Sequence, residues 1–282
     1  MSRQLISKNS LISAVSNRNI TEVKKLIEHV DINYMNSSQE TALSRACMYT
    51  SDEEHKMNGA QIEIILELLG HRDIDINSIG MTCDDTVAHI VFIVVRNILV
   101  YGDKNMILVL DILLKNKRFN VNTEMNGLSL LRYVCRFWDF VGDCVDNKLL
   151  ILDMLFSRKD LESTEHVISE FMYRSYYDAN MLENNINFFR ILSKNKKYLN
   201  SNIDTTCSNH TMFNELLLHY KHVGNSNAKM SCFRLMMDMI NDNDFDVNKK
   251  NDCNMSYLFI ASDYGLLDIV NMLLSRYDII ID

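Results

Sequence analysis

The sequence predicts an all-α solenoid built from about seven copies of a helix–loop–helix–finger unit. Three observations predict it: one short phrase recurs along the chain, the recurrences are regularly spaced, and the same order of helical signals stands between them. The phrase is clearest as LLGHRDIDIN at 68–77, LLKNKRFNVN at 113–122 and MINDNDFDVN at 239–248. Because such units bury their apolar faces only by stacking on their neighbours, we expect one array over 1–282.

The asparagine that ends the phrase sets the period of this array. Neighbouring anchors are 38 to 48 residues apart, and they are Asn33, Asn77, Asn122, approximately Glu162, Asn200 and Asn248. The approximate units are therefore 1–32, 33–76, 77–121, 122–161, 162–199, 200–247 and 248–282.

A serine or threonine precedes the first helix of each unit after the first. Its side-chain oxygen can accept a hydrogen bond from an N–H of the first helical turn, so these residues are favoured as helix caps. The expected caps are Thr41, Thr86, Ser129, Thr164, Thr211 and Ser256. In the middle units the distance from this cap to the next apolar pair is about ten residues longer than in the terminal units. We expect the added residues to lengthen the first helix by one or two turns and to form a longer polar loop.

The second helix of each unit is amphipathic and ends in the recurring phrase. Its apolar residues follow helical spacing in IEIILELLG at 62–70 and MILVLDILLK at 106–115. Basic residues follow, as at Arg72, Lys117 and Lys159, where a cation can complement the exposed carbonyls of the helix end. The alternating apolar residues of Ile-Asp-Ile-Asn then predict a short extended segment that leads into a polar, finger-like turn.

This layout resembles the ankyrin repeat. In the last unit, Ala261 and Gly265 follow Ser256 by five and nine residues, as in the family pattern, and the first unit ends in the same Asp-Ile-Asn at 31–33. Thr86 and His89 are read as the Thr and His of the family's Thr-Pro-Leu-His motif, with His89 a structural histidine hydrogen-bonded across the turns. The proline of that motif is replaced in every unit, and a HEAT-type helical solenoid of similar period remains the alternative. The composition resembles that of divergent ankyrin proteins of large DNA viruses, protists and intracellular bacteria.

Composition narrows the range of partners that the protein could bind. The formal net charge of −8 argues against nucleic acid as a partner, and the 8 scattered glycines form no phosphate-binding loop. The most apolar stretch, 87–101, is too short to span a membrane and is interrupted by charge, so we expect a buried helix and no membrane partner. Seven cysteines without a CxxC motif are expected to be reduced thiols in a cytoplasmic protein.

No catalytic, cofactor-binding or metal site is expected. Cys207, His210, His219 and His222 have zinc-ligand chemistry, but the two pairs should lie at opposite ends of one helix. Asp242, Asp244 and Asp246 begin like a calcium loop, which then lacks the required glycine and glutamate. We therefore expect a non-enzymatic protein without cofactors.

The resemblance implies a module that binds a polypeptide partner through the concave face of its fingers and first helices. The alternative is a host-directed adaptor, for a ubiquitin ligase or a signalling pathway, of a virus or intracellular pathogen. Candidate partner-binding residues are finger-tip side chains with mixed charge, together with one aromatic anchor: Tyr34, Asn36, Gln39, Glu40, Met81, Asp84, Asp85, Glu124, Met125, Trp138, Lys249, Lys250 and Asp252. Whether Phe137, Trp138, Tyr176 and Tyr177 are core or exposed is left open. Both terminal units are expected to lack polar outer faces, which predicts weak self-association.

Overall fold

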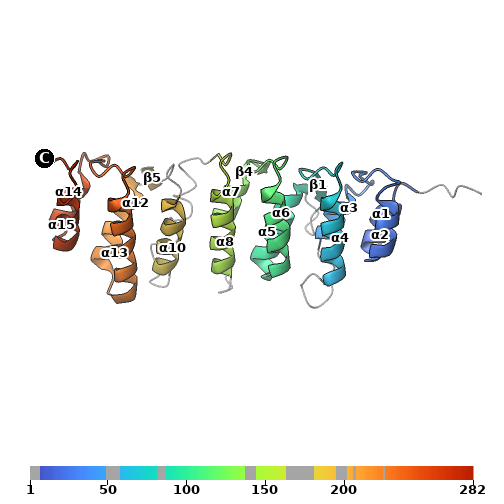
Figure 1. The fold of residues 1–282 in the computed structure, drawn as a ribbon, viewed down its shortest axis with the longest axis horizontal. Coiled ribbons are helices and arrows are strands. Elements are labelled where there is room, and N and C mark those ends of the chain that lie inside the picture. The colour runs from blue at the N-terminus through green and yellow to red at the C-terminus, as the bar shows by residue number, and fades with distance from the viewer. Residues whose placement is uncertain are drawn as a thin grey trace, which may run out of the picture. The chain divides into compact units, whose positions relative to one another are not determined.

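The computed structural model describes residues 7–48, 58–81, 87–136, 144–162, 181–194, 202–205, 208–224 and 226–281. The chain divides into two compact units, Met1–Leu161 and Glu162–Asp282, which are described separately. Both are mostly helical, with helices in pairs (Figure 1). The expectation of a purely α-helical chain is wrong in one respect, since the described residues include three short antiparallel hairpins between helix pairs.

In the unit Met1–Leu161, helix pairs stack in order. Its helices are α1 (Ser10–Ser16), α2 (Ile20–Leu26), α3 (Ala42–Cys47), α4 (Gly59–Gly70), α5 (Ile90–Tyr101), α6 (Lys104–Lys115), α7 (Leu130–Arg136) and α8 (Cys144–Phe156). Its hairpins are formed by β1 (Ile79–Met81) with β2 (Val87–His89), and by β3 (Glu124–Met125) with β4 (Leu128–Ser129). The first helices α1, α3, α5 and α7 form one row and the second helices α2, α4, α6 and α8 form another.

The unit Glu162–Asp282 repeats this arrangement. It contains α10 (Met181–Ser193), the hairpin of β5 (Asn202–Thr205) with β6 (Ser208–Thr211), α12 (Met212–His222), α13 (Ser226–Asn241), α14 (Tyr257–Asp263) and α15 (Leu267–Leu274). Here α12 packs on α13 and on α14, and α14 packs on α15. The helix expected after Thr164 falls outside the described residues, so a count of seven units stays a prediction.

Most of the expected caps are confirmed. The hydroxyls of Thr41, Thr211 and Ser256 each accept a hydrogen bond from the N–H three residues later, and Ser129 does the same at 3.3 Å. The expectation for Thr86 is wrong, because α5 begins only at Ile90 and His89 occupies its N-cap position. The chain continues as hairpin for three residues beyond Thr86 before the helix starts.

The second helices of the middle units are longer than those of the terminal units. These helices span 12 to 16 residues in α4, α6, α8, α10 and α13, against 7 in α2 and 8 in α15. The expected longer first helix is found in α5 and α12, with 12 and 11 residues, but is wrong for α3, which has 6. Asn58 and Asp103 explain the early starts of α4 and α6, since each caps its helix by accepting a backbone hydrogen bond.

The recurring asparagines form hydrogen-bonded rungs between successive units. The Asn77 Nδ2 donates to the Arg118 carbonyl at 2.8 Å, and its Oδ1 accepts from the Asn120 N–H at 2.8 Å. Asn33 makes the same pair of bonds to 73 and 75, and Asn248 makes it to 278 and 280. Asparagine suits this position because one amide offers both a donor and an acceptor to a single stretch of backbone.

The first and last fingers share one hydrogen-bonding pattern although they are more than 200 residues apart. Asn36 Oδ1 accepts from the N–H groups two and four residues later, and Asn251 Oδ1 does the same. Gln39 and Asn254, both three residues further on, adopt φ values of 58° and 59°. This identity of geometry supports a true structural repeat more directly than sequence spacing does.

Arginines after the second helices contact the unit before them rather than their own helix end. Arg158 donates from its guanidinium to the carbonyls of Leu114, Asn116 and Phe119. Arg276 donates to those of Ile240 and Asp242. The expected pairing of cations with helix-end carbonyls is therefore present for these arginines, but between neighbouring units.

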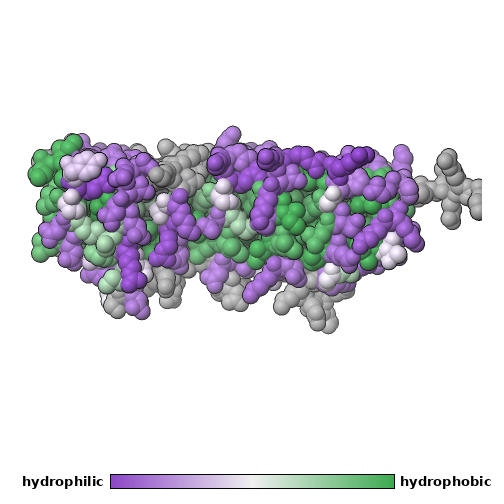
Figure 2. All heavy atoms as spheres, viewed as in Figure 1, coloured by the Kyte–Doolittle hydropathy of each residue, from purple (hydrophilic) through white to green (hydrophobic). Residues whose placement is uncertain are grey.

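The first and last helix pairs differ in polarity. The prediction that both terminal units lack a polar outer face is therefore wrong for the first unit. Exposed residues of α1 and α2 are serine, threonine and lysine, so the first helix pair has a polar surface. In α14 and α15, by contrast, Phe259, Leu267 and Leu274 are exposed. Figure 2 shows this apolar surface at the end of the unit that carries α14 and α15.

The apolar stretch 87–101 forms α5, which is buried along most of its length, as expected. Inside it, Asn97 is satisfied by donating to the Cys47 carbonyl at 2.8 Å. None of the helices in the described residues is long and apolar enough to cross a membrane.

Candidate functional site

The β1–β2 hairpin presents an apolar side to solvent. Its pairs are Ile79 with His89, Gly80 with Ala88, and Met81 with Val87. Gly80 and Ala88 are buried, whereas Ile79 and Val87 each leave more than a third of their surface exposed. Because side chains alternate along a strand, the two small residues face inward and the larger apolar ones face outward.

The inward side of the hairpin packs tightly on α3. A Cβ added at Gly80 would lie 2.1 Å from Ser44 Cβ, so only glycine fits. Ser44 is itself fixed, because its hydroxyl accepts a hydrogen bond from the Thr41 N–H in a capping box. The hairpin is thus held on a rigid helix start, which fixes the orientation of its outer side.

The fingers on both sides adjoin the hairpin. The Met81 N–H donates to the Gln39 carbonyl of the preceding finger at 3.2 Å, and β2 packs on β3 of the following one. Met35 is exposed on the preceding finger and Met125 is half-buried on the following one. We call the set Met35, Ile79, Met81, Val87 and Met125 the hairpin face.

His89 has the structural role that the sequence indicated. Its Nδ1 lies 2.9 Å from the Asn77 carbonyl oxygen, which ties the end of the hairpin to the start of the same finger. The contact crosses the turn as expected, although His89 stands at the helix cap rather than three residues inside the helix.

The candidate residues of the first finger divide into two groups. Asn36 and Glu40 maintain the turn: the Asn36 amide donates to the Glu40 carboxylate at 2.9 Å, and Glu40 also pairs with Arg45 at 3.4 Å. Tyr34 is half-buried and Gln39 is exposed. Gln39 and Tyr34 have no such role in the turn, whereas the side chains of Asn36 and Glu40 shape the finger.

The second and third fingers carry Met81, Glu124 and Met125. Met81 and Met125 belong to the hairpin face, and Glu124, which precedes Met125 in β3, is exposed. The β3–β4 turn consists of Asn126 and Gly127, both with positive φ, which is the geometry of a tight two-residue hairpin turn. Asp84, Asp85 and Trp138 lie outside the described residues, as do Phe137, Tyr176 and Tyr177.

The candidates of the last finger, Lys249, Lys250 and Asp252, lie in the other compact unit. Lys250 and Asp252 are exposed and Lys249 is half-buried. The hairpin face belongs to the unit Met1–Leu161.

Three members of the hairpin face were missed by sequence reasoning: Met35, Ile79 and Val87. The signal available was the strand alternation around 79–81 and 87–89, where Gly and Ala alternate with larger apolar residues. Because the finger was expected to be an irregular polar turn, this period of two was not read as a hairpin.

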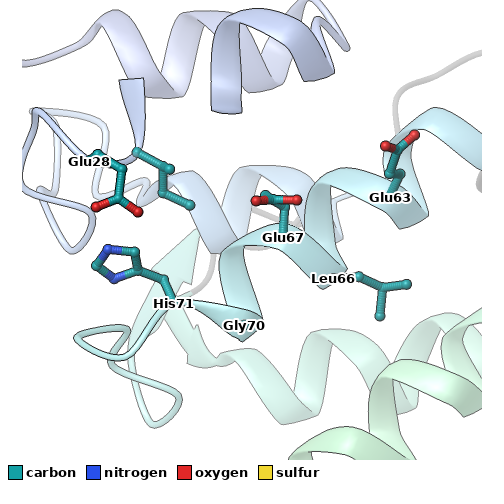
Figure 3. Close-up of a pocket in the computed structure, with 7 residues that line it drawn as sticks. Glu28, Glu63, Leu66, Glu67, Gly70 and His71 are labelled. Carbon is teal, nitrogen blue, oxygen red and sulfur yellow. The ribbon is translucent and has the colours of Figure 1, made fainter. Parts of the chain in front are cut away.

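A separate pocket of about 340 Å³ lies on the row of second helices, between α2 and α4. Figure 3 shows Glu28 and His71 on one side of it, with Glu63 and Glu67 along α4. Lys24 Nζ lies 3.0 Å from Glu63 and 3.7 Å from Glu67, so two of the three carboxylates already have a cationic partner. These are ordinary surface ion pairs, and none of the sequence-predicted site residues lines the pocket.

Within the described residues, no group of three or more His, Cys, Asp and Glu side chains is arranged to hold a metal ion. Of the zinc candidates, Cys207 lies outside those residues. The aspartates of the calcium-like sequence form a helix end, where the Asp242 carboxylate accepts from the Asp244 N–H and its carbonyl accepts from Arg276.

No protein-family model matches the sequence, and no curated protein matches it by sequence. The fold is similar to solved structures at low identity. One is an ankyrin repeat protein, EF0377, at 14% identity over 96% of this chain and 99% of that one, with a TM-score of 0.31. Another is the human ASB11 ankyrin repeat domain, at 14% identity over 96% and 99%, with a TM-score of 0.37. A third comes from the complex of the predatory endopeptidase Bd0816 of Bdellovibrio bacteriovorus with the immunity protein Bd3460, at 15% identity over 95% and 97%, with a TM-score of 0.33.

The stacked helix pairs, the capped first helices and the hairpins between them define a helical repeat protein. The repeat itself is established within the chain, by the matching fingers around Asn36 and Asn251 and by the asparagine rungs.

Proposed function

We propose that this protein is a polypeptide-binding module whose principal contact surface is the hairpin face. The observation that supports the proposal is the outward orientation of Ile79, Met81 and Val87 on a hairpin whose inner residues are fixed against α3. Apolar side chains in a rigid position lose little entropy on binding, and methionines adapt to partners of different shape.

The chemistry of the surrounding residues favours a polypeptide partner. Gln39 and Glu124 are exposed polar residues of the fingers that adjoin the hairpin, and apolar residues with polar neighbours are typical of protein interfaces. The formal net charge of −8 opposes a phosphate backbone as partner. Asp84 and Asp85 stay candidates for this border, as does Trp138 for a nearby anchor.

The test uses peptides selected by display against the full-length chain. The double variant with Ile79→Lys and Val87→Lys should bind the selected peptides with an affinity lower by about tenfold or more. Each substitution removes about 0.7 kcal/mol of binding free energy, which a peptide would gain by burying the exposed part of the apolar side chain. Each substitution also introduces a charge that a bound peptide must desolvate.

Leu108→Lys is the matched control, because Leu108 is exposed on α6 in the other row of helices. All variants should unfold at the same temperature as the wild type. Equal peptide affinity of the hairpin variant and the wild type would contradict the proposal, as would loss of affinity in the control alone.

A further inference from the structure

At two junctions between the ends of consecutive second helices, an arginine side chain lies between the two units. Arg158 connects the end of α8 to carbonyls at the end of α6, and Arg276 connects the end of α15 to carbonyls at the end of α13. Each guanidinium also pairs with the aspartate two residues later, Asp160 at 2.6 Å and Asp278 at 2.7 Å. The two arginine side chains are only 14% and 9% exposed, so each of these junctions is a binding site for a guanidinium that the chain itself supplies.

The corresponding residue at the junction of α2 and α4 is a histidine. The carbonyls of Arg158 and Arg276 each accept a hydrogen bond from the N–H three residues later, and the His71 carbonyl accepts from the Ile74 N–H in the same way. His71 is therefore the equivalent of the two arginines, and Asp73 is the equivalent of their paired aspartates. The α2–α4 junction retains the aspartate but has a shorter side chain in place of the arginine.

The His71 side chain leaves this junction open. Its Nδ1 accepts a hydrogen bond from the Asp73 N–H at 3.2 Å, so the ring is turned back on its own turn. The neighbouring Arg72 pairs with Asp73 at 3.3 Å, is 90% exposed and does not line the pocket. The pocket of about 340 Å³ lies at this junction, where Ile27 and Glu28 at the end of α2 face the end of α4.

The charge of the pocket suits a cation. Glu28, Glu63 and Glu67 line it, and Lys24 pairs with the last two of these. One ammonium group against three carboxylates leaves an excess of negative charge. Figure 3 shows the Glu28 carboxylate beside the His71 ring, at the position that corresponds to the arginines of the other junctions. The carboxylates alone would be an ordinary solvated surface, but the two filled junctions indicate which ligand has the right shape.

We propose that the α2–α4 pocket binds an arginine side chain of a partner polypeptide, in the place that Arg158 and Arg276 occupy at their own junctions. The guanidinium donates to carbonyls at the end of α2 and to the Glu28 carboxylate, because its planar fork carries five N–H donors. The aliphatic part of the arginine lies against Ile27 and Leu66, which line the pocket.

This site specifies a second contact of the polypeptide partner, so it rests on the proposed function for the class of its ligand. It does not rest on the hairpin face, because the pocket lies on the row of second helices. The two sites can therefore be tested separately.

The experiment is an NMR titration of the ¹⁵N-labelled full-length chain with the peptide acetyl-Ala-Arg-Ala-amide. The expected result is a saturable shift of the Gly70 and His71 amide signals. The same peptide with citrulline in place of arginine should bind about tenfold or more weakly, because it keeps the shape but loses the charge. The peptide with lysine should also bind more weakly, because an ammonium group cannot reproduce the forked contact.

Three variants locate the binding. His71→Arg should fill the pocket from within, so it should abolish peptide binding and raise the urea midpoint by restoring the pair with Asp73. Glu28→Gln should weaken binding by about threefold. Asp238→Asn is the matched control, because it removes one exposed carboxylate from the second helix α13, and its affinity should equal that of the wild type.

The double variant with Ile79→Lys and Val87→Lys should also bind the arginine peptide like the wild type, so failure of the hairpin face would not be mistaken for failure of this pocket. Unshifted Gly70 and His71 signals at the highest soluble peptide concentration would overturn the proposal. It would equally be overturned by undiminished binding of the citrulline or lysine peptide, by a folded His71→Arg chain that binds like the wild type, or by equal effects of Glu28→Gln and Asp238→Asn.

Discussion

Replacement of Gly80 by alanine tests how the hairpin is held on α3. The new Cβ would lie 2.1 Å from Ser44 Cβ and 2.5 Å from Ser44 Oγ. Rotation of the hydroxyl relieves only the second contact, because the position of a Cβ is set by the backbone. Either the hairpin or the start of α3 must therefore move.

The expected loss of stability has two parts, one from the packing of the hairpin on α3 and one from the capping box at the start of α3. Forcing a methyl group into a packed site costs about 1–3 kcal/mol. Displacing Ser44 also disturbs the capping box with Thr41, which is worth about 1 kcal/mol. We expect Gly80→Ala to lower the free energy of unfolding by about 2–4 kcal/mol.

The assay is urea denaturation followed by circular dichroism, with Gly59→Ala as the matched control. A Cβ at Gly59 has nothing within 4 Å, and this glycine opens α4, so alanine there should be neutral or slightly stabilising. The double variant Gly80→Ala with Ser44→Gly removes the atoms that clash. It should therefore recover more than about 1 kcal/mol relative to the sum of the single changes.

A Gly80→Ala protein as stable as the wild type would refute the tight contact. Additive effects in the double variant would show that the cost arises elsewhere than at Ser44.

Two further predictions concern the rungs and pH. Asn77→Ala should lower the free energy of unfolding by about 1–3 kcal/mol, since it removes two interunit hydrogen bonds. Asn77→Asp should be no better, because its second oxygen faces the Arg118 carbonyl, and wild-type stability of Asn77→Asp in urea would contradict this. Burial lowers the pKa of His219 from its ordinary value of 6.5, an effect opposed by Glu215 and increased by His222. The folded state thus favours the neutral form of His219. Its contribution to the free energy of unfolding is therefore complete above about pH 6.5 and is lost as the pH falls through the lower folded-state pKa. His219→Gln should therefore flatten the decline of the urea midpoint between about pH 7 and about pH 5, and an unchanged slope would exclude His219 as its cause.

The sequence predicted the helices and their caps well where the signals were local. Thr41, Thr211 and Ser256 were identified as caps because the preference depends on a side chain and a backbone group only three residues apart. Asn33, Asn77 and Asn248 were identified as repeat anchors by the recurring phrase and its spacing. Their role, a rung to the next unit, could not be read from spacing, because it depends on which carbonyl and N–H the next unit places within reach.

The candidate site was predicted less completely. Selecting polar finger-tip residues identified Gln39 and Glu124, but also Asn36 and Glu40, whose side chains maintain the turn. The apolar residues Ile79 and Val87 were passed over. Apolar character along the chain does not distinguish a side chain that packs inward from one held outward by the tight fit of its neighbour.

The sequence by itself determined that helix pairs repeat along the chain, where most first helices begin, and that asparagines recur between successive units. These properties depend on residues close to one another in the chain, so they are present in the amino-acid order. Only the tertiary structure decided that Arg158 and Arg276 donate hydrogen bonds to carbonyls of the preceding unit. It also decided that Gly80 fits closely against Ser44 while Ile79 and Val87 face outward, and that α14 and α15 expose Phe259, Leu267 and Leu274. Each of these depends on which surface of one unit lies against the next, and that is fixed by packing between residues some 35 to 45 positions apart.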